Sequence, residues 1–246
     1  MKLMNMTWVE VQNYLKQKDL LIIPIGAIEQ HGPMAPISTD VIVAEEIAER
    51  IAKKINAVIS PTISIGYVDP EFLRFPGTLS ISIETFCKLL EDFLISYSKQ
   101  GFKKFLIVNT HGTQKRFIKE ISEKVCIERK VKIIEFEYWN LLREEFKEFI
   151  ESELIHACED EISILLATRP QLIKINKMVD EMPIEAKINY FVYPLPKKYA
   201  TKSGVMGNPS LATKEKGEKI LNLIIEKIPE IIRKEFGEKY IKNLNE

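Results

Sequence analysis

A run of apolar residues from Leu20 to Ile25 ends at Gly26 and starts an alternation of apolar and amphipathic stretches along the chain. A continuous run of this kind is typical of a strand that is buried on both faces of a sheet. Three more strands are expected at 57–65, 105–108 and 131–136, and helices at 41–55, 83–100, 116–129, 144–150, 161–167 and 215–236. This order predicts an α/β fold with a mostly parallel sheet and helices on both of its faces.

The 246 residues suit a single domain, 1–246, because no linker, repeat or low-complexity tract divides them. Lys plus Arg equals Asp plus Glu at 35 each, and a chain with no basic excess is not expected to bind nucleic acid. The apolar runs are too short to span a membrane, and no signal peptide is evident. Three widely spaced cysteines predict no disulfide framework, which favours a reducing, cytoplasmic setting.

The chain has three histidines, His31, His111 and His156, and each lies in a polar motif. The first two follow runs that are predicted to be strands, and Glu29 lies two residues before His31. Because the carboxyl ends of parallel strands meet at one edge of a sheet, these side chains are expected to converge. Imidazole and carboxylate donors suit Zn, Mn or Fe(II) better than Ca.

Each of these residues also has an ordinary structural explanation. A single histidine after a strand is more often a hydrogen-bonded loop residue than a metal ligand. Asp40 precedes an amphipathic stretch and is well placed to be a helix N-cap. From the residues alone, the metal site and the purely structural explanation therefore both stay open.

Several ordered motifs resemble the creatininase family, the creatinine amidohydrolases. The most specific is PIGAIEQHGPMAPISTD, residues 24–40. The others are FPGTLS (75–80), NTHG (109–112), EYWNLL (137–142), HACEDEISILLATRPQLI (156–173) and SGVMGNPSLATKEKG (203–217). The resemblance implies a three-layer α/β/α sandwich, two divalent metal ions per chain and hydrolysis of amide-type C–N bonds.

The resemblance also implies roles for particular residues. Glu29 and His31 match ligands of different metals, Asp40 matches a carboxylate that bridges the two ions, and His111 pairs with Glu29. His156 matches an active-site histidine that handles substrate or protons, and Glu161 is expected to assist in proton transfer. Trp139 matches an aromatic residue of the substrate pocket.

The chain departs from creatininase itself at Thr113, where that enzyme has a glutamate ligand of the second metal. Glu159 matches a glutamate of other relatives, so we expect Glu159 to replace the missing ligand; a solvated acid at a helix start is the alternative. Cys158 stands where glycine is usual, and a small packed residue is favoured over a reactive thiol. A second tryptophan of the creatininase pocket is absent, so creatinine is not the expected substrate.

The predicted function is a metal-dependent amidohydrolase that cleaves an amide, cyclic amide or formamide bond of a small molecule through an activated water. The alternative is a binding or regulatory protein on the same scaffold with an incomplete metal site, which Thr113 keeps open. The resemblance further implies a homo-oligomer, a hexamer, for which the proline-rich segment 180–209 is a candidate subunit contact.

Overall fold

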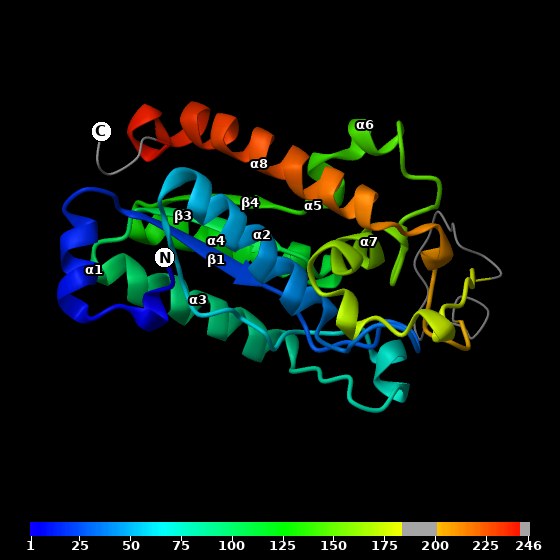
Figure 1. Ribbon diagram of the computed structural model, residues 1–246. Coiled ribbons are helices and arrows are strands. Elements are labelled where there is room, and N and C mark those ends of the chain that lie inside the picture. Colours follow the sequence, from blue (N-terminus) through cyan, green and yellow to red (C-terminus); the bar gives the residue numbers. More distant parts are fainter. Residues whose placement is uncertain (184–200, 242–246) are drawn as a thin grey trace.

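The computed structural model describes residues 1–183 and 201–241, and it is built around a four-stranded parallel sheet (Figure 1). The strand order is β2-β1-β3-β4. The strands are β1 (Leu20–Ile25), β2 (Val58–Ile59), β3 (Lys104–Asn109) and β4 (Lys132–Phe136). The two central strands, β1 and β3, are buried almost throughout, as a continuous apolar run requires.

Helices cover both faces of this sheet (Figure 1). They are α1 (Trp8–Leu15), α2 (Thr39–Ile55), α3 (Ile83–Gln100), α4 (Lys115–Arg129), α5 (Tyr138–Leu141), α6 (Arg143–Phe146), α7 (Glu159–Thr168) and α8 (Lys214–Phe236). Helices α2 and α8 pack on one face, and α3 and α4 pack on the other. The predicted three-layer α/β/α sandwich is therefore confirmed.

Alternation along β1 explains how one strand serves two cores. Leu20 and Ile22 belong to the core beneath α2 and α8, whereas Leu21 and Ile23 belong to the core beneath α1, α3 and α4. Successive side chains of a strand point to opposite faces, so a strand between two helical layers must be apolar at every position. A smaller third core, which includes Met34 and Leu165, packs around α7.

Some elements differ from those expected. The strand expected at 57–65 is only Val58–Ile59, because Pro61 cannot donate a ladder hydrogen bond and regular pairing with β1 ends before it. The helix expected at 144–150 is shortened to the single turn of α6, and the short α5 just before it was not expected. Helix α1 was not expected, although Thr7 and Glu10 form the capping box that marks its start.

The start of α2 also differs from the expectation. Its N-cap is Ser38, so Asp40 lies within the first turn and is not the cap. The strand ends hold this turn in place: Ile25 pairs with Asn109 across β1 and β3, and the next residue, Thr110, donates from its hydroxyl to the Asp40 carbonyl at 2.7 Å. Gly26 permits the approach, since a Cβ there would lie 2.6 Å from the backbone nitrogen of Val41.

Within the described ranges, no helix combines the length and the apolar character that crossing a bilayer demands.

Candidate metal centre

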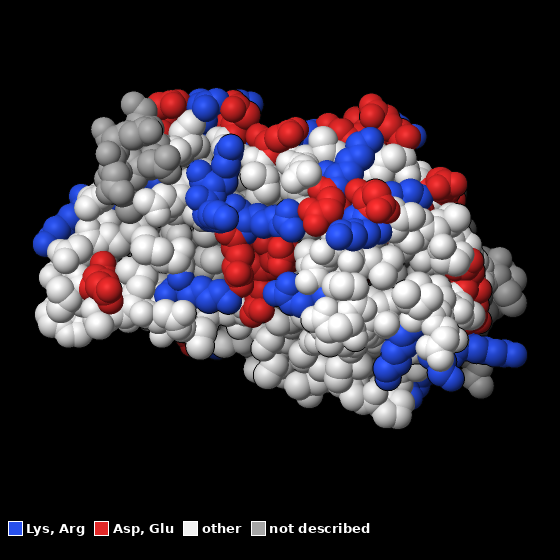
Figure 2. All heavy atoms as spheres, viewed as in Figure 1, with Lys and Arg blue, Asp and Glu red and all other residues white. Residues whose placement is uncertain are grey.

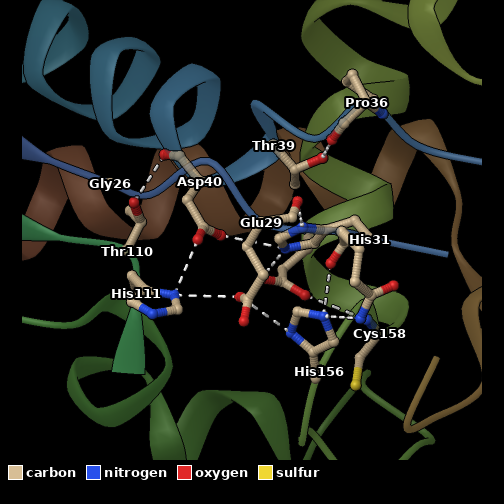
Figure 3. A network of polar contacts seen from close by, with 12 residues as sticks. Gly26, Glu29, His31, Pro36, Thr39, Asp40, Thr110, His111, His156 and Cys158 are labelled. Atoms are coloured by element: carbon tan, nitrogen blue, oxygen red, sulfur yellow. Dashed lines mark hydrogen bonds and ion pairs between the residues drawn. The ribbon is translucent and has the colours of Figure 1, made fainter. Parts of the chain in front are cut away.

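Four side chains that were predicted from two motifs, 24–40 and 109–112, meet at the carboxyl edge of the sheet (Figure 3). Glu29 and His31 lie in the loop after β1, Asp40 lies in the first turn of α2, and His111 follows β3. All four side chains are buried. They converge because β1 and β3 are adjacent and parallel, so that both loops leave the sheet at the same edge.

The first group of possible ligands is Glu29, Asp40 and His111. His111 Nδ1 lies 3.2 Å from Glu29 Oε2 and 3.0 Å from Asp40 Oδ2. With His111 in the neutral form that donates from Nε2, the buried Glu29 Oε1 and Asp40 Oδ2 accept no hydrogen bond from the described part of the chain. Buried carboxylate oxygens without donors are costly, and a cation between them removes that cost.

The second group is His31, Asp40 and Glu161. His31 Nε2 lies 3.1 Å from Asp40 Oδ1 and 3.4 Å from Glu161 Oε1. Asp40 belongs to both groups and presents a different oxygen to each histidine. A carboxylate shared in this way can bridge two metal ions.

Backbone carbonyls fix both histidines in the tautomer that a metal ligand needs. His31 Nδ1 lies 3.1 Å from the Glu29 carbonyl oxygen, and His111 Nε2 lies 3.1 Å from the Tyr67 carbonyl oxygen. A carbonyl only accepts, so these nitrogens donate and the other ring nitrogens face the carboxylates. Metal-binding histidines are held by backbone carbonyls in this manner, so the donor set fits divalent cations.

The charges of the site shift its pKa values in opposite directions. Burial lowers the pKa of His111, but the charge of Glu29 and the contact with Asp40 outweigh it and raise that pKa to about 10. Burial also lowers the pKa of His31, but the charges of Asp40 and Glu161 outweigh this effect and raise that pKa. Burial would raise the pKa of Asp40, but His31 and His111 hold it well below its usual range. Without metal, protons on the histidines supply the positive charge that the carboxylates require.

The structure does not bring Glu159 to these groups, contrary to the expectation from sequence. Its carboxylate is buried on another side of α7, where it forms an ion pair with Lys216. Glu161, two residues further on, reaches His31 instead. Thr113 contributes no carboxylate, and its hydroxyl donates to Asp69 at 3.2 Å.

His156 lies beside the two groups. His156 Nε2 lies 2.8 Å from the Gln30 carbonyl oxygen and 2.9 Å from the Gln30 side-chain nitrogen, and Nδ1 faces Glu29 Oε2 at 3.7 Å. The ring of Phe72 packs against His156 with centroids 4.7 Å apart. Glu29, His31 and His156 form a third, overlapping set of possible ligands.

A cavity of about 130 Å³ opens onto the cluster. Trp139, Leu154 and Ile155 form its apolar wall, and Asp160 is buried beside them with its carboxylate accepting from the Tyr138 hydroxyl at 2.8 Å. Asp160, Gln30 and Phe72 were not predicted. Asp160 and Gln30 lie within the quoted motifs, whereas Phe72 carried no sequence signal of its own.

Buried imidazole and carboxylate donors around a shared aspartate, at the carboxyl edge of an α/β/α sandwich, define a metal-dependent hydrolase. Comparisons with known proteins agree. The model of the creatininase family, creatinine amidohydrolase, matches residues 4–232.

Two relatives and one solved structure illustrate the match. Creatinine amidohydrolase of Pseudomonas putida is 26% identical over 94% of this chain and 95% of its own length. The 3-dehydro-scyllo-inosose hydrolase of Thermotoga maritima is 27% identical over 93% of this chain and 81% of its own length. A manganese creatininase structure superposes with a TM-score of 0.87 at 26% identity, over 96% of this chain and 99% of its own. The chain belongs to the creatininase family, whose members are metal-dependent amidohydrolases that act on C–N bonds of small molecules.

Proposed function

We propose that this chain is a two-metal amidohydrolase in which Asp40 bridges the ions. Glu29 and His111 hold one divalent cation, and His31 and Glu161 hold the other. The observation that carries the proposal is the pair of buried histidines, each donating to a backbone carbonyl and turning its remaining nitrogen toward two carboxylates. Nitrogen and oxygen donors of this kind suit Zn, Mn or Fe(II).

When bound, the two ions supply Lewis acidity, which makes a water more acidic and polarises the scissile carbonyl. His156 is the residue that moves a proton, because its Nδ1 faces the cluster while Nε2 is held by Gln30. Glu161 does not share this proton transfer, because one of its oxygens faces His31 and the other accepts from the Cys158 backbone N–H at 3.2 Å.

The substrate is a small molecule with an amide, cyclic amide or formamide bond. A cavity of about 130 Å³ holds a compact group, and Trp139 offers it a flat apolar wall. The relatives include enzymes named for creatinine and for a formylamino pyrimidine, which places compact polar rings with an amide or formamide bond among the first compounds to test. The three unpaired cysteines suit a reducing compartment, and we propose the cytoplasm.

The test is metal loading followed by an activity screen. Chelator-treated protein is reloaded with Zn²⁺, Mn²⁺ or Fe²⁺, its metal content is measured by elemental analysis, and it is assayed against cyclic amides, formamides and short peptides. We expect two ions per chain and turnover of a small cyclic amide or formamide. A chain that binds no divalent ion, or that binds two and cleaves none of these bonds, contradicts the proposal.

A variant at the pocket wall refines the test. Trp139→Ala should leave two ions bound and raise KM by about 10-fold, since burying an aromatic contact contributes about 1.5 kcal/mol or more. Trp139→Phe keeps a flat ring and should lie between the parent and Trp139→Ala. An unchanged KM in Trp139→Ala would show that this side chain does not contact the substrate.

A further inference from the structure

The segment 151–156 forms one wall of the cavity and contains no helix or strand; its only backbone pairing with the described residues is an isolated bridge in which His156 and Met206 exchange hydrogen bonds of 3.2 and 2.9 Å. Leu154, Ile155 and His156 from this segment line the cavity, and Ile155 is 44% exposed. The segment connects α6 to α7. Something other than a helix or a strand must therefore fix its position relative to the metal cluster.

Glu159, the first residue of α7, is bonded to the beginning of this segment. Its side chain is completely buried. Oε2 accepts from the backbone N–H of Glu151 at 3.0 Å and from that of Ser152 at 2.8 Å. Oε1 is paired with Lys216 in the first turn of α8. The carboxylate thus joins the loop to two helices.

Lys216 is itself held tightly. Its ammonium group also donates to the Leu211 carbonyl at 3.1 Å and to the Glu151 carboxylate at 2.7 Å. The adjacent residue, Gly217, lies where α7 and α8 touch through their backbones, since a Cβ there would fall 2.0 Å from the Ser163 carbonyl oxygen. This close approach sets Lys216 beside Glu159. The Glu159 carboxylate is fully buried and the Lys216 side chain is 17% exposed, and an ion pair of this kind with all of its hydrogen bonds made resists displacement.

The far end of the segment is fixed by a second set of contacts. The Ile155 backbone N–H donates to Cys158 Sγ at 3.1 Å, and the thiol donates to the Met206 carbonyl at 3.0 Å. Ala157, which lies between His156 and Cys158, has a φ of 52°. This left-handed conformation costs about 1 kcal/mol for a residue with a Cβ. Such a conformation persists only where the surroundings enforce it, so His156 sits on backbone that its neighbours hold in place.

We infer that Glu159, in its pair with Lys216, is a positioning residue that fixes the 151–156 loop and through it places His156 and the apolar wall against the substrate. This inference rests on the proposed function for its catalytic consequence. Glu159 acts through the backbone N–H groups of Glu151 and Ser152, and it binds no metal ion.

The test compares Glu159→Gln with Glu151→Gln. Both remove one charge that faces Lys216, but Glu151 has a 63% exposed side chain and its loop-anchoring group is the backbone N–H, which the substitution keeps. In Glu159→Gln, the amide oxygen and the NH₂ group cannot satisfy both the backbone donors and Lys216. We expect amide hydrogen exchange in 151–156 to accelerate about 10-fold or more in Glu159→Gln and to stay at the parent rate in Glu151→Gln.

Two further variants keep the inference testable if Glu159→Gln does not fold. Lys216→Met leaves a buried carboxylate without its counter-charge and should also accelerate exchange in the loop. Adding Lys216→Met to Glu159→Gln removes the competing donor, so the amide oxygen can accept from the loop, and exchange should return toward the parent rate.

Metal content and kinetics complete the experiment. At a temperature where every variant is folded, Glu159→Gln should retain two ions per chain while kcat falls about 10-fold or more, because the loop that carries His156 keeps only one of its two anchors. Loss of one ion would make Glu159 a ligand and overturn the inference, as would unchanged exchange in the loop. If the parent itself cleaves no amide, the proposed function fails, but the exchange comparison still decides whether Glu159 anchors the loop.

Discussion

Glu161 Oε1 lies 3.4 Å from His31 Nε2, on a helix that begins far from His31 in the sequence. The contact supplies the second group of possible ligands with a carboxylate, which Thr113 cannot provide. A chain can thus lack one ligand of the family pattern and still bring three donors around each of two positions. This weakens the alternative of a binding protein with an incomplete metal site.

Glu161→Gln should therefore remove one ion of two and most turnover. Gln presents a neutral oxygen, which binds a divalent cation more weakly than a carboxylate does, and we expect the affinity of that ion to fall about 10-fold or more. Elemental analysis after dialysis measures the loss. Glu159→Gln is the matched control two residues away and should keep both ions; if Glu161→Gln also keeps both ions, Glu161 is not a ligand.

Asp40→Ala should have the largest effect, because the Asp40 carboxylate faces both histidines. We expect most of the bound metal and at least about 100-fold of the activity to be lost. Helix α2 should survive, since Ser38 is its N-cap and Asp40 caps nothing. Circular dichroism checks the fold and elemental analysis checks the metal. Two ions retained per chain in Asp40→Ala would exclude a bridging role.

The metal-free protein should be most stable in mildly acidic solution. The pKa of His111 is raised to about 10, so its contribution to stability is complete below its unfolded value of about 6.5 and is lost as the pH rises toward 10. The pKa of Asp40 is lowered, so its contribution is present above about pH 4 and is lost as the pH falls further. Thermal unfolding of chelator-treated protein should show a broad maximum of Tm between about pH 4.5 and 6.5.

Metal binding should release protons for the same reason. The nearby carboxylates raise the pKa of both buried histidines in the metal-free protein, so we expect both to carry an extra proton at pH 7. A ligand must be neutral, so metal loading should release up to about two protons per chain. Calorimetric titration in buffers of different ionisation enthalpy measures this number. A release of no protons would mean that the histidines are not ligands.

The protein should be a homo-oligomer, and a hexamer is expected. The segment expected to contribute, 180–209, lies partly outside the described residues. Independently of that segment, Met4 and Trp8 are 73% and 76% exposed beside an apolar groove near the N-terminus, and apolar surface of this kind is commonly covered by another subunit. Figure 2 shows that much of the visible face carries neither acidic nor basic side chains. Light scattering across a wide concentration range provides the test, and a persistent monomer contradicts the prediction.

Local pattern was sufficient for the regular parts of the fold. The run Leu20–Ile25 and the amphipathic stretch Ile83–Gln100 are the strand and the helix that the sequence predicts, with the same bounds. Both signals are strong. Burial on two faces makes every residue of the strand apolar, and burial on one face repeats apolar residues at each turn of the helix. The strand predicted at 57–65 was too long, because apolar character alone does not reveal where strand pairing stops.

The sequence by itself determined that Glu29, His31 and His111 follow buried strands, and parallel strands must release their loops at one edge of the sheet. It could not determine which acid of α7 reaches them. Glu159 and Glu161 are separated by roughly 200° around a helix, so one faces the cluster and the other faces away. Only the packing of α7 against α8, in backbone contact at Gly217, decided that Glu159 meets Lys216 and Glu161 meets His31.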